Sequence, residues 1–312
     1  MASLRHEWIE GAGGVGEANI VVSFFVPAAL REAMHVEGES GTGWLERLPT
    51  RVPELERAWE LTVGRAFDGG TCAWVAPVRH ADGSKAVLKI GFPSREARHE
   101  SDALRCFDGH GAVRLLRASE DGSALLLERC SPGNDLWTMG GEERDALGAD
   151  VLRRLWRDAP LPVAFDSLSG IAQAWGGLLS GETIAAEYDP GLIARAVEIG
   201  LELTATSPAI VLLHGDFHPG NVLSSTREPW LAIDPKPLVG DPAYDLAQWI
   251  GNHCEDAISE PNSIAVMRRQ IDRFSNSLGL DPIRVAGWAF VKSLGWNWGA
   301  PSVRLLHKLV SS

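Results

Sequence analysis

The segment that most restricts the fold of this chain runs from His214 to Asn221 and reads His-Gly-Asp-Phe-His-Pro-Gly-Asn. An apolar stretch, Trp230–Ile233, ends at Asp234, thirteen positions after Asn221. Phosphoryl transfer needs a carboxylate beside the attacking hydroxyl and oxygen ligands for a metal that neutralises phosphate charge. We therefore expect Asp216 to be the base, and Asn221 and Asp234 to be the metal ligands. The two segments together predict a phosphoryl-transfer site.

The spacing within this loop is that of protein kinases. Four residues separate Asp216 from Asn221, as in the kinase catalytic loop H-R-D-x-x-x-x-N. Gly215 stands where that loop has Arg, which indicates that there is no activation-loop phosphate to bind. Asp234 is followed by Pro235-Lys-Pro instead of Phe-Gly, so the flexible switch of protein kinases is missing. We expect a constitutively active small-molecule kinase.

The loop also resembles that of the aminoglycoside phosphotransferases, which reads H-G-D-x-x-x-x-N. Within them, the stretch Ala232–Ala247 looks like the branch of streptomycin 6-kinases and hydroxyurea phosphotransferases. The resemblance runs from about Val26 to the C-terminal helices and is strongest at 211–249. It implies an α+β, protein-kinase-like bilobal fold with a small antiparallel β N-lobe and a larger, mostly helical C-lobe. It also implies ATP and Mg²⁺ as cofactors.

Length and composition agree with two lobes. A chain of 312 residues with 45% apolar content exceeds the comfortable size of one core. We expect a flexible tail over 1–19, a nucleotide-binding N-lobe over 20–130 and a helical C-lobe with the acceptor site over 131–312. The Pro-Gly break at Ser131–Gly133 follows an apolar strand and marks the boundary. Gly11–Gly16 fits G-x-G-x-x-G, but no strand precedes it, so we interpret it as part of the tail.

Alternating β-prone residues follow short helices that are predicted from Val26 to Pro49. The three strands expected after them are Trp59–Val63, Thr71–Val78 and Ala86–Ile90, the last two joined through an Asp-Gly turn. The connection before the second strand contains Gly69 and Gly70, where a kinase places its glycine-rich phosphate flap. A plain β-turn is the alternative.

Lys89 lies inside the apolar run Val87–Ile90. A lone lysine in a strand is usually an exposed edge charge. The predicted helix Ser94–Arg105, however, carries Glu96 and Glu100, which matches a strand lysine paired with a helix glutamate that orients the α- and β-phosphates. The resemblance favours Glu100 as the partner.

The nucleotide base has a candidate site at the end of the apolar strand Ala124–Cys130. The resemblance implies an interlobe hinge here, where backbone groups near Glu128 and Cys130 bind the adenine edge. A simple exit of the strand into a loop is the alternative. The rest of the chain predicts helices over 141–207 and over two C-terminal segments, Ser263–Leu278 and Asp281–Trp298.

Other polar residues near the motif have structural interpretations. His214 and His218 have a spacing that suggests zinc, but they lie in a loop, and we expect His214 to hold the backbone instead. Asp241, which precedes Pro242, and Asp245 are expected to cap the following helix or to hold the catalytic loop.

Charge and cysteine content restrict the classes of binding partner and the cellular compartment that we expect. A formal charge of −12 argues against nucleic acids and anionic membranes, and it either suits a cationic substrate or serves solubility alone. The four cysteines form no C-x-x-C pair, and there is no long apolar segment, so we expect a cytoplasmic protein. We expect a monomer or weak dimer that acts on a small molecule.

Three functions remain open at this stage. The first is ATP-dependent phosphorylation of an aminoglycoside hydroxyl, with a streptomycin-type acceptor favoured and antibiotic resistance as the role. The second is a kinase for a sugar, amino sugar or other small metabolite, which would use the same catalytic residues. The third is a nucleotide-binding pseudokinase, which has no physical need for Lys89, Asp216, Asn221 and Asp234 together.

Overall fold

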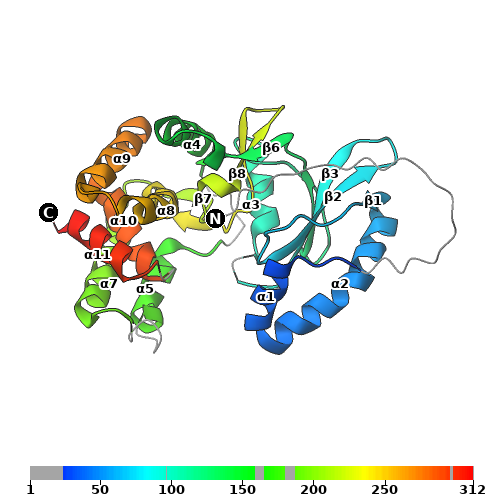
Figure 1. Ribbon diagram of the computed structural model, residues 1–312, viewed down its shortest axis with the longest axis horizontal. Helices are drawn as coiled ribbons and strands as arrows, with labels where there is room; N and C mark the ends of the chain where they lie inside the picture. Colours follow the sequence, from blue (N-terminus) through cyan, green and yellow to red (C-terminus); the bar gives the residue numbers. More distant parts are fainter. Residues whose placement is uncertain (1–23, 96, 159–164, 180–186, 296–297, 312) are drawn as a thin grey trace. The chain divides into compact units, whose positions relative to one another are not determined.

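The computed structural model describes residues 24–95, 97–158, 165–179, 187–295 and 298–311 (Figure 1). Its contacts divide the chain into two compact units, Met1–Pro93 with Leu116–Arg129, and Ser94–Leu115 with Cys130–Ser312. The tail predicted over 1–19 lies outside the described residues. The lobe boundaries at 20–130 and 131–312 stay predictions.

The first unit is built on a five-stranded sheet whose order is β1-β2-β3-β5-β4. Its strands are β1 Leu61–Val63, β2 Ala73–His80, β3 Lys85–Gly91, β4 Leu115–Ala118 and β5 Ala124–Glu128. β2 is antiparallel to both β1 and β3, and β5 is antiparallel to β3. The antiparallel sheet predicted for the N-terminal part is therefore confirmed, with more strands than the minimum of three.

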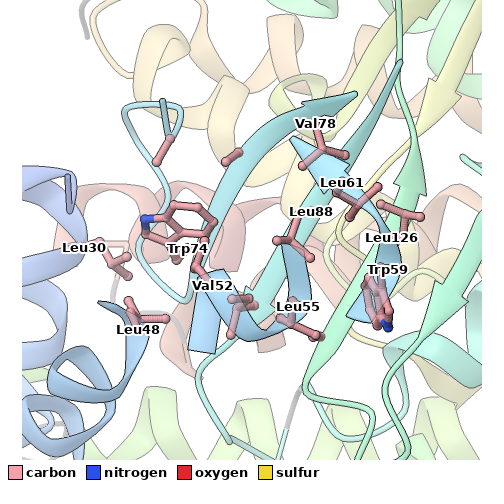
Figure 2. Packing of buried hydrophobic residues seen from close by; sticks show 14 of the residues in the cluster. Leu30, Leu48, Val52, Leu55, Trp59, Leu61, Trp74, Val78, Leu88 and Leu126 are labelled. Carbon is pink, nitrogen blue, oxygen red and sulfur yellow. The ribbon is translucent and has the colours of Figure 1, made fainter. Parts of the chain in front are cut away.

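Two helices, α1 Ala28–Val36 and α2 Gly38–Trp59, cover one face of this sheet. Figure 2 shows the core between them, in which Leu48, Val52 and Leu55 of α2 pack toward Trp74 and Leu88 of the strands. The face of β3 that carries Leu88 and Ile90 is thus filled by helix side chains. Because side chains alternate along a strand, Lys89 points to the opposite face.

The prediction that a strand begins at Trp59 was wrong. α2 continues to Trp59 through Pro49 and Pro53, and it ends where Glu60 adopts a left-handed conformation. The buried residues of α2 recur every three or four positions, at Trp44, Leu48, Val52, Leu55 and Trp59. Burying each one contributes roughly 1.5–3 kcal/mol, which together outweighs about 3 kcal/mol for each interior proline.

The helix predicted over Ser94–Arg105 begins later than expected. The observed helix, α3, spans Glu100–Phe107 and belongs to the second unit. Before it, the hydroxyl of Ser94 accepts a hydrogen bond from the backbone N–H of Ala97 at 3.2 Å. The N–H groups of Arg98 and Glu100 then donate to carbonyls three residues back, those of Arg95 and Ala97, each at 3.3 Å, so the chain forms turns before the α-helix begins. Glu96, the alternative partner for Lys89, lies outside the described residues.

The second unit is mostly helical (Figure 1). Its larger helices are α4 Gly141–Leu155, α5 Leu168–Leu179, α7 Pro190–Ala205, α8 Leu246–Ala257, α9 Ser263–Leu278, α10 Pro282–Gly295 and α11 Ala300–Val310. α9 has the predicted bounds, and α10 falls within the predicted helix Asp281–Trp298. The mainly helical C-terminal part is confirmed. In the part of the chain that the structure describes, no helix combines the length and apolarity needed to cross a membrane.

Short strands in the second unit present the predicted catalytic loop. β7 Val211–Leu213 pairs antiparallel with β10 Leu238–Gly240. β8 Val222–Ser225 pairs antiparallel with β9 Trp230–Ala232 and with β6 Pro132–Asp135. The loop 214–221 leaves β7 and enters β8, while Asp234 lies between β9 and β10. Two strand pairs therefore bring the two sequence motifs together.

Candidate active site

Backbone hydrogen bonds join the two predicted motifs directly. The N–H of Ile233 donates to the carbonyl of Asn221 at 2.9 Å, and the N–H of Lys236 donates to the carbonyl of His214 at 2.8 Å. Asp234 thus follows a residue that is bonded to Asn221. The structure brings the second motif alongside both ends of the first.

Gly215 occupies a position that no other residue fits. Its φ is 80°, in the left-handed region, and a Cβ built on it would lie 1.9 Å from the carbonyl oxygen of Lys236. A side chain would need both a strained backbone and displacement of that neighbouring segment. The absence of Arg before Asp216 is therefore imposed by the close approach of the two motifs.

Asp245 holds the start of the catalytic loop through its carboxylate. One carboxylate oxygen, Oδ1, accepts from the N–H of Gly215 at 2.7 Å, and Oδ2 accepts from the N–H of His214 at 3.0 Å. Oδ2 also accepts from the indole N–H of Trp156 at 2.9 Å. Asp245 is fully buried, where charged acceptors form strong bonds to backbone donors. Its predicted role in holding the loop is confirmed.

His214 is a structural residue of the loop. Its Nε2 lies 2.9 Å from the carbonyl oxygen of Ile233, and its Nδ1 accepts from the N–H of Asp216 at 3.3 Å. Nε2 therefore carries the proton, because it faces an acceptor. Burial lowers the pKa of His214, which keeps the ring neutral. The expectation that His214 holds backbone is confirmed, and both ring nitrogens are occupied without a metal.

The loop also rests on aromatic side chains. Phe217 is fully buried and stacks on Trp249 of α8, with ring centroids 5.3 Å apart. Trp249 in turn donates its indole N–H to the buried carboxylate of Asp145 at 2.9 Å. Because Phe217 directly follows Asp216, this packing limits the motion of the base candidate.

Asp216, the base candidate, is 8% exposed and faces Lys236. Its Oδ2 lies 3.0 Å from the Nζ of Lys236. Burial by itself raises the pKa of Asp216, but the ammonium groups of Lys292 and Lys236 lower it to about 2. The carboxylate is therefore anionic at neutral pH. Because the Asp216 carboxylate is a weak base, it orients the acceptor hydroxyl and accepts the proton only late in the transfer. This suits the loose transition state of phosphoryl transfer.

The donor set of Asn221 and Asp234 fits a hard cation. Asn221 uses its amide nitrogen to donate to the carbonyl of Asp216 at 3.0 Å, so its amide oxygen is the atom left for a ligand. Asp234 has a φ of 58°, a left-handed conformation that costs energy in a residue other than glycine and recurs at functional sites. An amide oxygen and a carboxylate are ligands that Mg²⁺ accepts beside phosphate oxygens and water.

Asp241 has a structural role in the turn after β10. Its Oδ1 accepts from the N–H of Ala243 at 3.0 Å, which caps the turn Pro242–Asp245. Its Oδ2 accepts at 2.9 Å from Nε of Arg284 and from the indole of Trp288, both on α10. The predicted cap is confirmed, and Asp241 additionally ties the turn to α10.

The nucleotide candidates of the first unit lie on β3, β5 and the loop before β2. Lys89 is 8% exposed on β3, which lies between β2 and β5, so it is not an exposed edge charge. Glu128 is the last residue of β5. Gly69 has a φ of 103°, and a Cβ on Gly70 would lie 2.9 Å from the carbonyl oxygen of Ala73. The flap and hinge roles stay predictions.

The remaining candidates, Glu100 and Cys130, belong to the second unit. Glu100 is the first residue of α3 and is 5% exposed, and a carboxylate at a helix N-terminus is favoured by the helix dipole. Cys130 follows β5 by two residues and is half-buried. The pairing of Glu100 with Lys89 stays a prediction.

Sequence reasoning missed two residues around Asp216. Lys236 was noted only as part of Pro235-Lys-Pro, although it contacts the carboxylate. Lys292 was passed over within a predicted helix, although its Nζ donates to the carbonyl of Gly215 at 2.8 Å. A single charged residue in the mainly apolar run Trp288–Leu294 was the available signal, since a buried lysine needs a partner.

Comparison with known proteins places this site in a family. Residues 58–297 match the model of the aminoglycoside/hydroxyurea antibiotic resistance kinases. The chain is 38% identical over 264 residues to a streptomycin 6-kinase of Streptomyces glaucescens, covering 82% of this chain and 84% of that protein. It is 37% identical over 287 residues to a hydroxyurea phosphotransferase of Kitasatospora aureofaciens, covering 90% and 79%.

Solved structures share the fold at low identity. A choline kinase from Streptococcus pneumoniae superposes with a TM-score of 0.57 at 12% identity, covering 86% of this chain and 98% of that one. An aminoglycoside phosphotransferase solved with ADP and hygromycin B gives a TM-score of 0.54 at 15% identity, covering 83% and 97%. The predicted α+β, protein-kinase-like fold is confirmed.

Proposed function

The chain belongs to the aminoglycoside/hydroxyurea antibiotic resistance kinases, and from this membership we propose that it transfers the γ-phosphate of ATP to a hydroxyl of a streptomycin-type aminoglycoside. As an aminoglycoside kinase it has a role in antibiotic resistance. The observation that carries the proposed phosphoryl transfer is the arrangement of Asp216, Asn221 and Lys236 in one hydrogen-bonded loop system.

In the proposed reaction Asp216 orients the acceptor hydroxyl toward the γ-phosphate. Its carboxylate is anionic at neutral pH because Lys292 and Lys236 lower its pKa to about 2 against the effect of burial. Holding a hydroxyl in line with the phosphate removes much of the entropic barrier of the transfer. As the bond from the γ-phosphorus to the bridging oxygen of ADP breaks, the hydroxyl oxygen bonds to phosphorus and its proton passes to Asp216.

Asn221 and Asp234 would hold Mg²⁺, which supplies positive charge to the phosphate oxygens when bound. Lys89, paired with Glu100, would orient the α- and β-phosphates. The backbone at Gly69 and Gly70 would cover them, and the backbone near Glu128 and Cys130 would bind the adenine edge. The burial of Lys89 supports its part in this proposal, since a buried ammonium suits a bound anion.

The acceptor assignment depends on the relatives and on charge. Two streptomycin 6-kinases, at 38% and 35% identity, favour a streptomycin-type acceptor. The formal charge of −12 supports a cationic substrate through long-range attraction. Hydroxyurea is the second candidate, because a hydroxyurea phosphotransferase is 37% identical over 90% of this chain. The scattered cysteines support action in the cytoplasm, where we propose a monomer or weak dimer.

An acceptor panel tests the proposal. Mg²⁺-dependent ADP release is measured with streptomycin, another aminoglycoside, hydroxyurea and an amino sugar, with Asp216→Asn as the blank. We expect streptomycin to give the highest kcat/KM and the blank to fall to background. Turnover with hydroxyurea alone would replace the acceptor and keep the mechanism. Nucleotide binding without turnover of any acceptor would contradict the proposal.

A further inference from the structure

Lys292 is a buried lysine in the last turn of α10. It is 1% exposed and sits in the run Trp288-Ala-Phe-Val-Lys-Ser-Leu294, whose other members are also buried. Removing an ammonium group from water is strongly unfavourable unless the protein supplies compensating contacts. A methionine or leucine would fill the same space without that cost. The retention of a lysine here requires an explanation.

The ammonium group of Lys292 reaches the catalytic loop. Its Nζ donates to the carbonyl oxygen of Gly215 at 2.8 Å. It also lies 4.9 Å from the ring centroid of Tyr244, whose aromatic face attracts a cation. Tyr244 belongs to the turn Pro242–Asp245 that precedes α8. Lys292 therefore joins α10 both to the loop and to the turn beneath it.

Both polar backbone groups of Gly215 are bonded to charged side chains. Asp245 accepts from its N–H at 2.7 Å, and Lys292 donates to its carbonyl at 2.8 Å. The carbonyl of Gly215 belongs to the peptide group that links Gly215 to Asp216. Because a peptide group is planar, holding this oxygen also holds the nitrogen and Cα of Asp216, to which the Asp216 side chain is attached. Gly215 itself has a φ of 80°, so its own conformation is not the one most residues prefer.

We propose that Lys292 is a positioning residue for phosphoryl transfer, and that it acts by clamping the Gly215–Asp216 peptide so that the Asp216 carboxylate meets the acceptor hydroxyl. This inference rests on the proposed role of Asp216 as the base. Lys236 contacts the Asp216 carboxylate itself at 3.0 Å. Both ammonium groups lower the pKa of that carboxyl, and Lys292 in addition holds the backbone that carries it through the carbonyl of Gly215.

Positioning and simple stabilisation predict different kinetics. A misplaced base slows the chemical step, so kcat falls while the KM for MgATP changes little. A loss of folded protein would instead lower the concentration of active enzyme and leave the kcat of the folded fraction unchanged. Three variants separate these cases: Lys292→Met removes the donor and the charge, Lys292→Gln keeps a neutral donor, and Ser293→Ala changes the neighbouring buried residue of α10.

The kinetic experiment compares these variants with the wild type, with each concentration corrected for folded protein by nucleotide binding. We expect Lys292→Met to lower kcat by about 10- to 100-fold with KM for MgATP within about twofold. Lys292→Gln should recover part of the loss, and Ser293→Ala should match the wild type. A folded Lys292→Met enzyme with wild-type kcat overturns the proposal. If Lys292→Met does not fold, Lys292→Gln decides: its shorter, uncharged donor should leave kcat below that of the wild type, and a wild-type kcat there would show that no charged clamp is needed.

Amide hydrogen exchange tests the clamp without an acceptor, and so separates its failure from failure of the proposed function. In Lys292→Met we expect faster exchange in a peptide spanning 214–217 and unchanged exchange in α9. Equal loop exchange in wild type and Lys292→Met overturns the clamp even if streptomycin is phosphorylated. Faster loop exchange in an enzyme that phosphorylates no member of the panel supports the clamp and rejects the assigned reaction.

Discussion

The ammonium nitrogen of Lys236 lies 3.0 Å from Oδ2 of Asp216, although twenty positions separate the two residues in the chain. The contact exists because the segment after Asp234 returns along the loop, where the N–H of Lys236 bonds to the carbonyl of His214. The side chain and the backbone of one residue thus hold both the base candidate and the loop that carries it. This explains why a lysine between two prolines matters to the site.

Replacing Lys236 tests that contact. In Lys236→Met the Asp216 carboxylate loses its charged partner and can leave the orientation needed for the acceptor. We expect kcat to fall by about 10- to 100-fold, with a smaller change in nucleotide affinity. Steady-state kinetics and calorimetric titration with nucleotide measure the two effects. Lys236→Arg, which keeps a cation, should retain more activity, and a Lys236→Met enzyme with wild-type kcat would refute the role.

Gly215 gives a stability prediction. In Gly215→Ala the new Cβ meets the carbonyl of Lys236 and the backbone keeps a left-handed φ, so we expect a loss of at least about 2 kcal/mol of unfolding free energy. Gly141→Ala is the matched control, because a Cβ there meets nothing within 4 Å. It should be neutral or stabilising by up to about 1 kcal/mol. Denaturant unfolding measures the unfolding free energy of both variants. Equal values would show that the segment around Lys236 moves away to accept the new Cβ.

Buried histidines give a pH prediction. Burial lowers the pKa of His214, His218 and His253 from their ordinary value of 6.5. The unfolded chain therefore binds protons near pH 6.5 that the folded chain binds only at lower pH. The free energy of unfolding is therefore highest above about pH 6.5. It decreases below that pH by up to about 1.4 kcal/mol per pH unit for each histidine.

Unfolding free energies measured between pH 5 and pH 8 test this slope. His253→Gln is informative, because the Nδ1 of His253 is buried without a hydrogen-bond partner in the described structure. In His253→Gln the unfolding free energy should decrease less steeply below pH 6.5, by the contribution of one histidine. Stability that stays constant or increases as the pH falls below 6.5 would contradict the neutral state assigned to these rings.

Asp234 gives the metal prediction. Asn tolerates the left-handed region, so Asp234→Asn should keep the φ of 58° and the fold while it removes the charge of a metal ligand. We expect a higher Mg²⁺ concentration for half-maximal activity and a kcat lower by roughly 100-fold or more. The same substitution at the exposed Asp272 serves as control. An unchanged Mg²⁺ requirement in Asp234→Asn would remove Asp234 from the metal site.

The parts of this molecule that were predicted correctly are those governed by local pattern. α9 begins and ends at the predicted residues, and Gly279, which follows it, has a positive φ that glycine adopts without strain. The loop 214–221 and the segment that ends at Asp234 were predicted to form one site, and backbone hydrogen bonds join them. α2 was mispredicted, because Pro49 normally ends a helix and only the tertiary burial of its apolar stripe overrides that tendency.

The two lysines around Asp216 show what local pattern misses. Lys236 and Lys292 lie 20 and 76 positions from Asp216, and the fold alone brings them to it. Side-chain partners at such separations depend on strand pairing and helix docking that no window of sequence encodes. Gly215 was visible in the sequence as a departure from the kinase motif. The cause, which is the close approach of the carbonyl of Lys236, appears only in the structure.

The most direct test of the account is the identity of the product. Purified enzyme is incubated with MgATP and streptomycin, and the drug is analysed by mass spectrometry and ³¹P NMR, with Asp216→Asn in parallel. The account predicts streptomycin that gains one phosphoryl group at a hydroxyl, formed by the wild type and not by Asp216→Asn. Unmodified streptomycin with the wild type, or equal product with Asp216→Asn, would contradict it.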